Sequence, residues 1–501
     1  MSSKSFSLHS PRTSGLDPRW LPLVVTTVGS FMSILDTNIV NIALPKILDD
    51  FDSSLENGQL VVGSYLIALA VVIPLTGFLS ERVGMKRLYM FTLFFFVFGS
   101  ALCGLAWNVE SLIAFRVIQG LGGGMLQPLG MAIVFTMITP LERPRFMALL
   151  GIPVLIAPII GPSLGGYLVE YSSWRTVFLI NVPVGLFDIF LAYKLLKETE
   201  LKPETKMDFK GFGLAAVAFP CLLFGFTRGS EIGFDSSFVI GLLIVGAIAF
   251  VAFVLVELNH HDPMLRVRLF GDATFRYALL IQWVGMFSLF GLNFIIPLYL
   301  QRVQGLSPGD AGRVLLPMGI VAFITMNIAG RMYLKIGPRP LIMSGLSVLA
   351  LTTFLWSRLG LHAGTVPMMV LASGRGLGLG MFSQNIQLVA YNTLKQSEIP
   401  RATGLVNVGQ RITGAVSTAT LASLLVVALG WTGAPVGSSI AEGTAPLSDM
   451  RTAFGDVFIF MTVLSLVGVV LGAFVRDHTL ERKQAEERGE AVEERSEALA
   501  H

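Results

Sequence analysis

Long apolar runs separated by short polar connections repeat along the whole chain. Each run is close to the ~20 residues that an α-helix needs to cross the hydrocarbon core of a bilayer. Many runs contain glycine and proline, which membrane helices tolerate and use for close packing. The pattern predicts fourteen spanning helices, near residues 19–44, 57–80, 87–107, 109–133, 145–169, 176–197, 209–228, 236–257, 276–302, 311–334, 340–358, 365–391, 402–429 and 453–475.

Positively charged residues fall mainly on one side of this arrangement. An even number of spans puts both ends of the chain on the same side of the membrane. Basic residues then gather in the tails on that side and in loops 80–88 and 194–210, whereas the opposite loops hold few, such as Lys46 and Arg228. Cytoplasmic loops carry such an excess of Lys and Arg. We therefore expect both termini in the cytoplasm.

Composition agrees with a membrane protein. Hydrophobic residues make up 53% of the chain and charged residues only 14%, whereas soluble domains carry about 25% charge. The two cysteines, Cys103 and Cys221, lie in apolar runs and form no disulfide framework. Only His260 and His261 are neighbouring histidines, so we expect no metal site. A phosphate-binding Walker motif is absent from the sequence, which does not favour ATP hydrolysis.

An internal repeat divides the chain. "GFLSERVGMKRL" (77–88) and "GRMYLKIGPRPL" (330–341) share glycines and basic residues at matching positions, and both follow a predicted span. Repeated halves are typical of secondary transporters, whose site lies between the halves near the bilayer midplane. The predicted organisation is a cytoplasmic tail (1–18), a six-helix bundle (19–197), two inserted membrane helices with their flanking loops (198–275), a second six-helix bundle (276–475) and a charged cytoplasmic tail (476–501).

Five motifs in order resemble one family. They are "LDTNIVNIALP" (35–45), "GFLSERVGMKR" (77–87), "LIAFRVIQGLGGG" (112–124), "GIPVLIAPIIGPSLGG" (151–166) and "SWRTVFLINVPVG" (173–185). Together they are similar to the signatures of the major facilitator superfamily, and within it of the fourteen-span drug:proton antiporters. The resemblance covers about residues 19 to 475. It implies an all-α membrane fold and transport of a small molecule in the plasma membrane, with protons as the coupling ion and no other cofactor.

Two of these motifs imply functional residues. The motif at 77–87 resembles a cytoplasmic gate motif, with an acid retained at Glu81 where the family usually has Asp. Its residues here are Gly77, Glu81, Arg82, Gly84, Lys86 and Arg87. Lys86 and Arg87 fit ordinary positive-inside charge equally well. The motif at 151–166 resembles the antiporter motif, which seals the contact between the halves. Its residues here are Gly151, Gly161, Pro162, Gly165 and Gly166. Ordinary packing of small residues is the alternative for this second set.

Asp36 and Arg116 are the predicted proton-coupling residues. Each is a charged side chain inside an apolar run, which is costly and marks function in membrane helices. Asp36 lies about 22 Å from the cytoplasmic end of its span, and Arg116 about 10 Å from the outer end of its own. In a core of about 30 Å these heights nearly coincide. We therefore expect the two side chains to share one polar pocket, through a salt bridge, a water bridge or proximity.

Other polar residues lie inside the predicted spans. Asp188 is a candidate for a second proton carrier. Arg375 and Arg411 fit either structural pairing or contact with an anionic group. The predicted cavity-lining residues are Asn41, Gln119, Gln127, Asn293, Arg375, Gln384 and Asn385.

The sequence predicts a secondary exporter that works by alternating access rather than an enzyme. Its expected partners are an amphipathic or cationic hydrophobic compound and the lipid bilayer, with no nucleic acid, and we expect the monomer to be functional. Two alternatives remain open at this stage. One is transport of a specific metabolite, siderophore, peptide or lipid on the same scaffold. The other is a membrane sensor that has lost transport.

Overall fold

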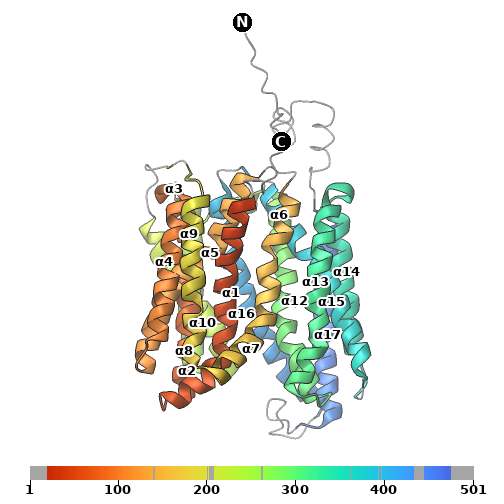
Figure 1. The fold of residues 1–501 in the computed structure, drawn as a ribbon. Coiled ribbons are helices and arrows are strands. Elements are labelled where there is room, and N and C mark those ends of the chain that lie inside the picture. The colour runs from red at the N-terminus through yellow and green to blue at the C-terminus, as the bar shows by residue number, and fades with distance from the viewer. Residues whose placement is uncertain are drawn as a thin grey trace.

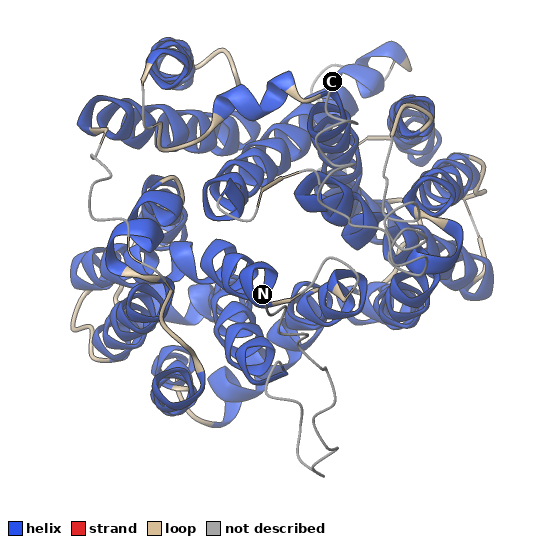
Figure 2. Cartoon of the chain, turned by 90° about the horizontal axis from the view of Figure 1, so that it is seen from above, coloured by secondary structure: helices blue, strands red, loops and turns tan. Residues whose placement is uncertain are grey.

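The structure is a computed structural model that describes residues 20–138, 142–199, 201, 208–260, 263–361, 363–392, 394–395, 398–433 and 445–475. Within these ranges the chain is helical and contains no strand (Figures 1 and 2). The two predicted cytoplasmic tails, 1–18 and 476–501, lie outside the described residues.

The helices of the first half follow one another with short connections. They are α1 (Trp20–Asp50), α2 (Leu55–Val72), α3 (Leu75–Val83), α4 (Met85–Gly104), α5 (Val109–Met137), α6 (Arg143–Leu150), α7 (Ile152–Tyr171), α8 (Trp174–Leu179) and α9 (Asn181–Leu195). The remaining elements are α10 (Phe209–Ile232), α11 (Ser237–Asn259), the 3-10 helix η1 (Val267–Gly271), α12 (Ala273–Arg302), α13 (Pro308–Ile336), α14 (Pro338–Ser357), α15 (Thr365–Asn392), α16 (Ile399–Trp431) and α17 (Leu447–Gly472).

Twelve of the predicted spans agree with the structure in length and apolar character. Among the described residues eleven helices are long and apolar enough to cross a membrane, or twelve if the bent pair α2–α3 is one span. The other two predicted runs, 145–169 and 365–391, fall on α6–α7 and on α15. The count of fourteen spans therefore remains a prediction.

The bend between α2 and α3 was not predicted. The two helices meet at 57°, and Pro74 occupies the N-cap of α3. Proline lacks an N–H group and clashes with the preceding turn, which explains a break at this point. The bend aims α3 and its charged residues at one end of the bundle, the upper end in Figure 1, where α6 also lies. We call it the α3–α6 end; α1 begins there, since Trp20 stacks on Phe146 of α6.

Helices α10 and α11 pack against each other and connect the two halves. α10 contacts α2 of the first half and α16 of the second. A buried apolar cluster joins these helices and includes Ile73, Phe219 and Val408. Large apolar side chains of α11, including Ile248 at 65% exposed, point away from the protein. Exposure of this kind along a helix fits contact with lipid.

Candidate functional site

Asp36 lies at the centre of a buried hydrogen-bond network between α1, α2, α4, α5 and α9. Its side chain is fully buried, and Oδ2 forms an ion pair with Arg116 Nη1 at 2.5 Å. Oδ1 accepts hydrogen bonds from Gln119 Nε2 at 2.8 Å and Asn181 Nδ2 at 3.0 Å. Among the described residues, every group that hydrogen-bonds this carboxyl is an N–H donor, so the contacts suit an ionised Asp36.

Arg116 is compensated on all sides. Its side chain is 1% exposed. Nη1 also donates to Gln119 Oε1 at 2.7 Å, and Nε donates to the Val61 carbonyl at 3.3 Å. The guanidinium carbon lies 4.0 Å from the centre of the Tyr65 ring, a distance typical of a cation–π interaction. The structure thus brings together the two charged residues whose depths in the sequence matched.

The helices around this pair are held at one height by neutral polar groups. Gln119 lies one turn after Arg116 on α5, so both side chains face α1. Gln119 and Asn181 also donate to the hydroxyl of Ser100 on α4, at 2.7 Å and 3.3 Å. Buried polar groups need such partners, because an unpaired one costs free energy. With the contacts of Arg116 to Val61 and Tyr65 on α2, the network ties five helices of the first half together.

Three members of the network were missed by the sequence analysis. Asn181 stands within the fifth motif, and Tyr65 and Ser100 lie within the predicted spans 57–80 and 87–107. The available signal was a polar side chain within an apolar run. Gln119, predicted to line the cavity, instead lies fully buried inside the network.

A second buried ion pair joins the two halves at the α3–α6 end. Glu81 Oε2 of α3 lies 2.6 Å from Arg401 Nη2 of α16, and these side chains are 7% and 2% exposed. Gly77 allows the approach, because a Cβ atom there would lie 2.7 Å from the Arg401 Cα. Arg401 precedes the predicted span at 402–429, so the apolar pattern gave no signal for it.

Arg401 also holds the segment that follows the inserted helices. Its Nη1 donates to the Pro263 carbonyl at 2.9 Å. The fully buried carboxylate of Glu257 on α11 accepts from the backbone N–H groups of Met264 at 3.3 Å and Leu265 at 3.1 Å. Residues 263–265 after α11 are therefore bonded both to α11 and to the ion pair that crosses the halves.

The other predicted gate residues contact their own half. Glu198 caps the start of α4, accepting from the backbone N–H groups of Lys86 at 3.2 Å and Arg87 at 3.3 Å. Gly84 has φ +96°, and a Cβ there would lie 2.2 Å from Glu198 Oε1. Arg82 is exposed, with its guanidinium 5.9 Å from the Phe78 ring centre. Among these contacts, none of the three basic side chains reaches the second half.

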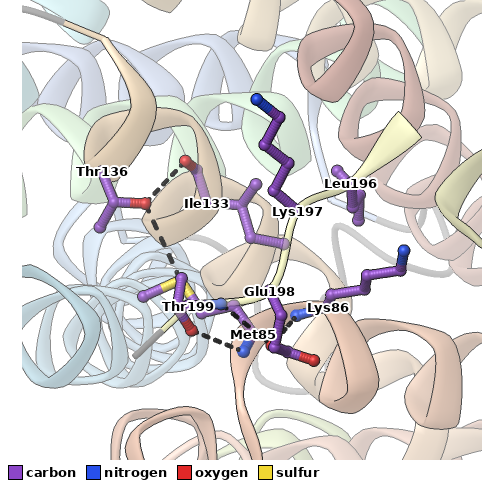
Figure 3. A pocket seen from close by; sticks show the side chains of 8 residues that line it. All are labelled: Met85, Lys86, Ile133, Thr136, Leu196, Lys197, Glu198 and Thr199. Atoms are coloured by element: carbon purple, nitrogen blue, oxygen red, sulfur yellow. Dashed lines mark hydrogen bonds between the residues drawn. The ribbon is translucent and has the colours of Figure 1, made fainter. Parts of the chain in front are cut away.

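A small pocket lies beside this cap (Figure 3). Its volume is about 120 Å³. Figure 3 shows Thr199 and Glu198 bonded to the start of α4, with Thr136 of α5 opposite. These bonds satisfy the first N–H groups of α4, which no helical carbonyl reaches. The pocket therefore belongs to the packing of a helix start.

The comparison with known families decides the identity of the fold. The profile of the Major Facilitator Superfamily matches residues 26–418 and, in a second overlapping match, residues 278–499. The chain belongs to the Major Facilitator Superfamily. It is therefore a multi-pass membrane transporter of this superfamily, as the five motifs predicted.

Individual relatives of the superfamily align over most of the chain. It is 31% identical to the multidrug resistance protein B homolog of Mycobacterium tuberculosis, over 92% of this chain and 91% of that protein. It is 32% identical to the uncharacterized MFS-type transporter YhcA of Bacillus subtilis, over 80% and 76%. The crystal structure of the human organic anion transporter MFSD10 superposes with a TM-score of 0.64 at 16% identity, over 91% of this chain and 100% of that one. This last likeness concerns the fold alone.

The residues that resemble the superfamily's antiporter motif do not share one partner. A Cβ at Gly151 would lie 2.6 Å from Gln384 Nε2 and Met326 Sδ, both in the second half. A Cβ at Gly161 or Gly165 would meet α1 instead, at 3.0 Å and 2.8 Å. Gly166 has open space around its Cβ position, and the side chain of Pro162 lies outside the described residues. Only the start of α7 thus packs closely across the halves through these glycines.

The predicted cavity-lining residues of this transporter are scattered. Arg375 is 1% exposed and donates to the carbonyls of Ser288 and Leu289 at 3.1 Å, with Asn293 Oδ1 at 3.5 Å. These contacts hold α15 against α12, which favours the structural alternative for Arg375. The other predicted residues are the exposed Asn41, bonded within its own helix, the half-buried Gln127 and Gln384, and Asn385, buried and also bonded within its helix.

Proposed function

We propose that this chain is a proton-coupled antiporter that exports amphipathic or cationic hydrophobic compounds across the plasma membrane. It would work as a monomer of fourteen spans, with two six-helix bundles, an inserted helix pair, and protons as the coupling ion. Its α3–α6 end would face the cytoplasm, where the basic loops lie. Access to the central site would alternate between the two sides.

The observation that carries this proposal is the buried Asp36–Arg116 pair. In the contacts described, Asp36 accepts only from N–H donors and is balanced by one guanidinium. A proton arriving on Asp36 removes this balance, since the neutral acid leaves the Arg116 charge uncompensated. The network must then rearrange, and because it links α1, α2, α4, α5 and α9, the rearrangement moves helices. Proton binding would therefore change the conformation.

The ion pair between Glu81 and Arg401 supports the alternating part of the proposal. It crosses the two halves at the proposed cytoplasmic end, together with the close contact at Gly77. Opening this end must separate two buried charges, which is costly unless water or new partners reach them. The pair would thus hold the cytoplasmic side closed in one state and part in the other.

The substrate class follows from the same charge. A cationic compound offers Asp36 the positive charge that Arg116 supplies in this state, so the proton and the compound would compete for one carboxylate. The name of the Mycobacterium tuberculosis relative, a multidrug resistance protein B homolog, supports a broad range of drug-like compounds.

Dye efflux from proteoliposomes with an imposed pH gradient tests the proposal. We expect wild-type protein to move a lipophilic cationic dye against its gradient, and Asp36→Asn to abolish gradient-driven movement while the protein stays folded. Asp310→Asn is the matched control, because Asp310 is a partly exposed acid at the start of α13. Undiminished pH-driven transport by Asp36→Asn would refute the role of Asp36. Dye movement by wild-type protein that ignores the pH gradient would refute proton coupling.

A further inference from the structure

A second carboxyl group is buried among the same helices as Asp36. Asp188 of α9 is fully buried between α1 and α4. Its Oδ2 lies 3.3 Å from the hydroxyl oxygen of Tyr89 on α4. Its Oδ1 has no hydrogen-bond partner among the described residues. Within the same part of the chain, no Lys, Arg or His forms an ion pair with it.

The number of hydrogen atoms that the Tyr89 hydroxyl can donate bears on the charge of Asp188. The Tyr89 hydroxyl lies 3.0 Å from the Val25 carbonyl oxygen and 3.3 Å from Asp188 Oδ2. A phenol has one hydrogen to donate, and both a carbonyl and an ionised carboxylate can only accept. Both contacts are hydrogen bonds at once if Tyr89 donates to Val25 and a protonated Asp188 donates to Tyr89.

The contact between these two side chains is shaped by Gly29 on α1. A Cβ atom at position 29 would lie 2.2 Å from the Tyr89 hydroxyl oxygen and 3.2 Å from Asp188 Oδ2. Only a glycine therefore lets the hydroxyl reach the Val25 carbonyl on the same helix. The arrangement uses a residue from each of three helices, as expected of a built site rather than a chance contact.

The Asp188 site lies two helical turns from the Asp36 site, along both α1 and α9. Asp188 follows Asn181, which donates to Asp36, by two turns of α9, and Gly29 precedes Asp36 by two turns of α1; both intervals are about 10 Å. An apolar layer separates the two levels. A Cβ at Gly185 would lie 2.2 Å from Val97 and 3.0 Å from Met32, which are 6% and 2% exposed.

We propose that Asp188 carries a proton in this state and is a second proton-binding carboxyl of the transporter. Asp36 is surrounded by N–H donors and a cation, and Asp188 by a phenol and apolar side chains, so their surroundings favour opposite protonation states. Two titratable groups separated in this way can take different roles in one reaction. The apolar layer prevents direct proton transfer between them. Each would exchange its proton with solvent in a different conformation.

Few groups of the described residues face Asp188. Tyr89 from α4 is the titratable group in contact with it, and α1 presents Val25 and Gly29. The nearest acid along α1 is Asp36, beyond the apolar layer. Any loss of the Asp188 proton must therefore accompany a movement of α1, α4 or α9 that lets water in.

Infrared difference spectroscopy of the purified protein tests the protonation state without any transport assay. We expect the wild type to show the carbonyl stretch of a protonated carboxylic acid at neutral pH, and Asp188→Asn to lose it. Tyr89→Phe should shift the same band, because it removes the hydrogen-bond partner. The control is the double variant Asp36→Asn/Arg116→Gln, which should leave the band in place. Asn at position 188 can still donate to Tyr89, so this variant should keep its fold. A spectrum unchanged by Asp188→Asn would overturn the proposal.

The second measurement counts protons, and this step rests on the proposed antiport. In proteoliposomes, the dependence of substrate accumulation on the pH gradient should become shallower in Asp188→Asn, by one proton per cycle. If the wild type shows the band but Asp188→Asn moves the same number of protons per cycle, Asp188 only forms a structural hydrogen bond. That result would overturn its role in transport. Failure of the antiport proposal itself is seen separately, as wild-type transport that ignores the pH gradient while the band remains.

Discussion

Replacing Asp36 with Asn leaves the Arg116 guanidinium buried without a counter-charge. The guanidinium is 1% exposed and lies 2.5 Å from the carboxylate. At an effective dielectric constant of about 20, two unit charges at that distance attract by roughly 6–7 kcal/mol before desolvation is counted. Breaking one side of a buried pair usually costs about 3–5 kcal/mol. We expect the free energy of unfolding of Asp36→Asn to fall by this amount.

Removing both charges should cost much less. Replacing a buried ion pair by neutral groups is often nearly neutral in stability, because both desolvation penalties disappear. The double variant Asp36→Asn/Arg116→Gln should therefore be more stable than Asp36→Asn alone. A double-mutant cycle should give a coupling energy of about 2–3 kcal/mol between the two positions.

Thermal unfolding of the four proteins in one detergent measures this prediction. Asp310→Asn serves as a control for loss of a partly exposed acid, which should change stability by less than about 1 kcal/mol. Additive single-variant effects, with the double variant the least stable protein, would refute the reasoning. Such a result would mean that Arg116 finds its compensation in the Tyr65 ring and the carbonyl of α2 rather than in Asp36.

Three further substitutions test the contacts at the α3–α6 end. Gly77→Val should push α3 away from the α16 backbone and raise the reactivity of cysteines introduced at this end several-fold, whereas Gly166→Val, with open space at its Cβ, should leave it unchanged. Glu257→Ala removes the acceptor of two buried backbone N–H groups, so the thermal midpoint should fall, reflecting about 2–3 kcal/mol; an unchanged midpoint would contradict this view of the segment after α11. Gly84→Ala meets both a positive φ and the carboxylate that caps α4, and should destabilise by at least 1 kcal/mol in the same assay; a more stable variant would show that the cap does not constrain the turn.

Much of the fold could be read from the sequence because a bilayer imposes a local rule. A span must be long, apolar and internally hydrogen-bonded, so each helix can be recognised from a run of about 20 residues. The break at Pro74 was not found, although the residue was visible, because proline inside a membrane helix is often tolerated. The gate pair was half found: Glu81 stood in a motif, whereas Arg401 lay among ordinary loop charges.

The sequence by itself determined twelve runs that are long and apolar enough to cross a membrane, and it placed Asp36 and Arg116 at one depth. Only the tertiary structure decided that Gln119 completes their network, that Glu81 meets Arg401, and that Asp188 faces a phenol instead of a cation. Depth depends on counting residues along one helix. Contact depends on which faces of separate helices pack together. Small residues allow that packing: a Cβ at Gly99 would lie 2.5 Å from the backbone of α5. Such contacts join residues that are close in space but not along the chain.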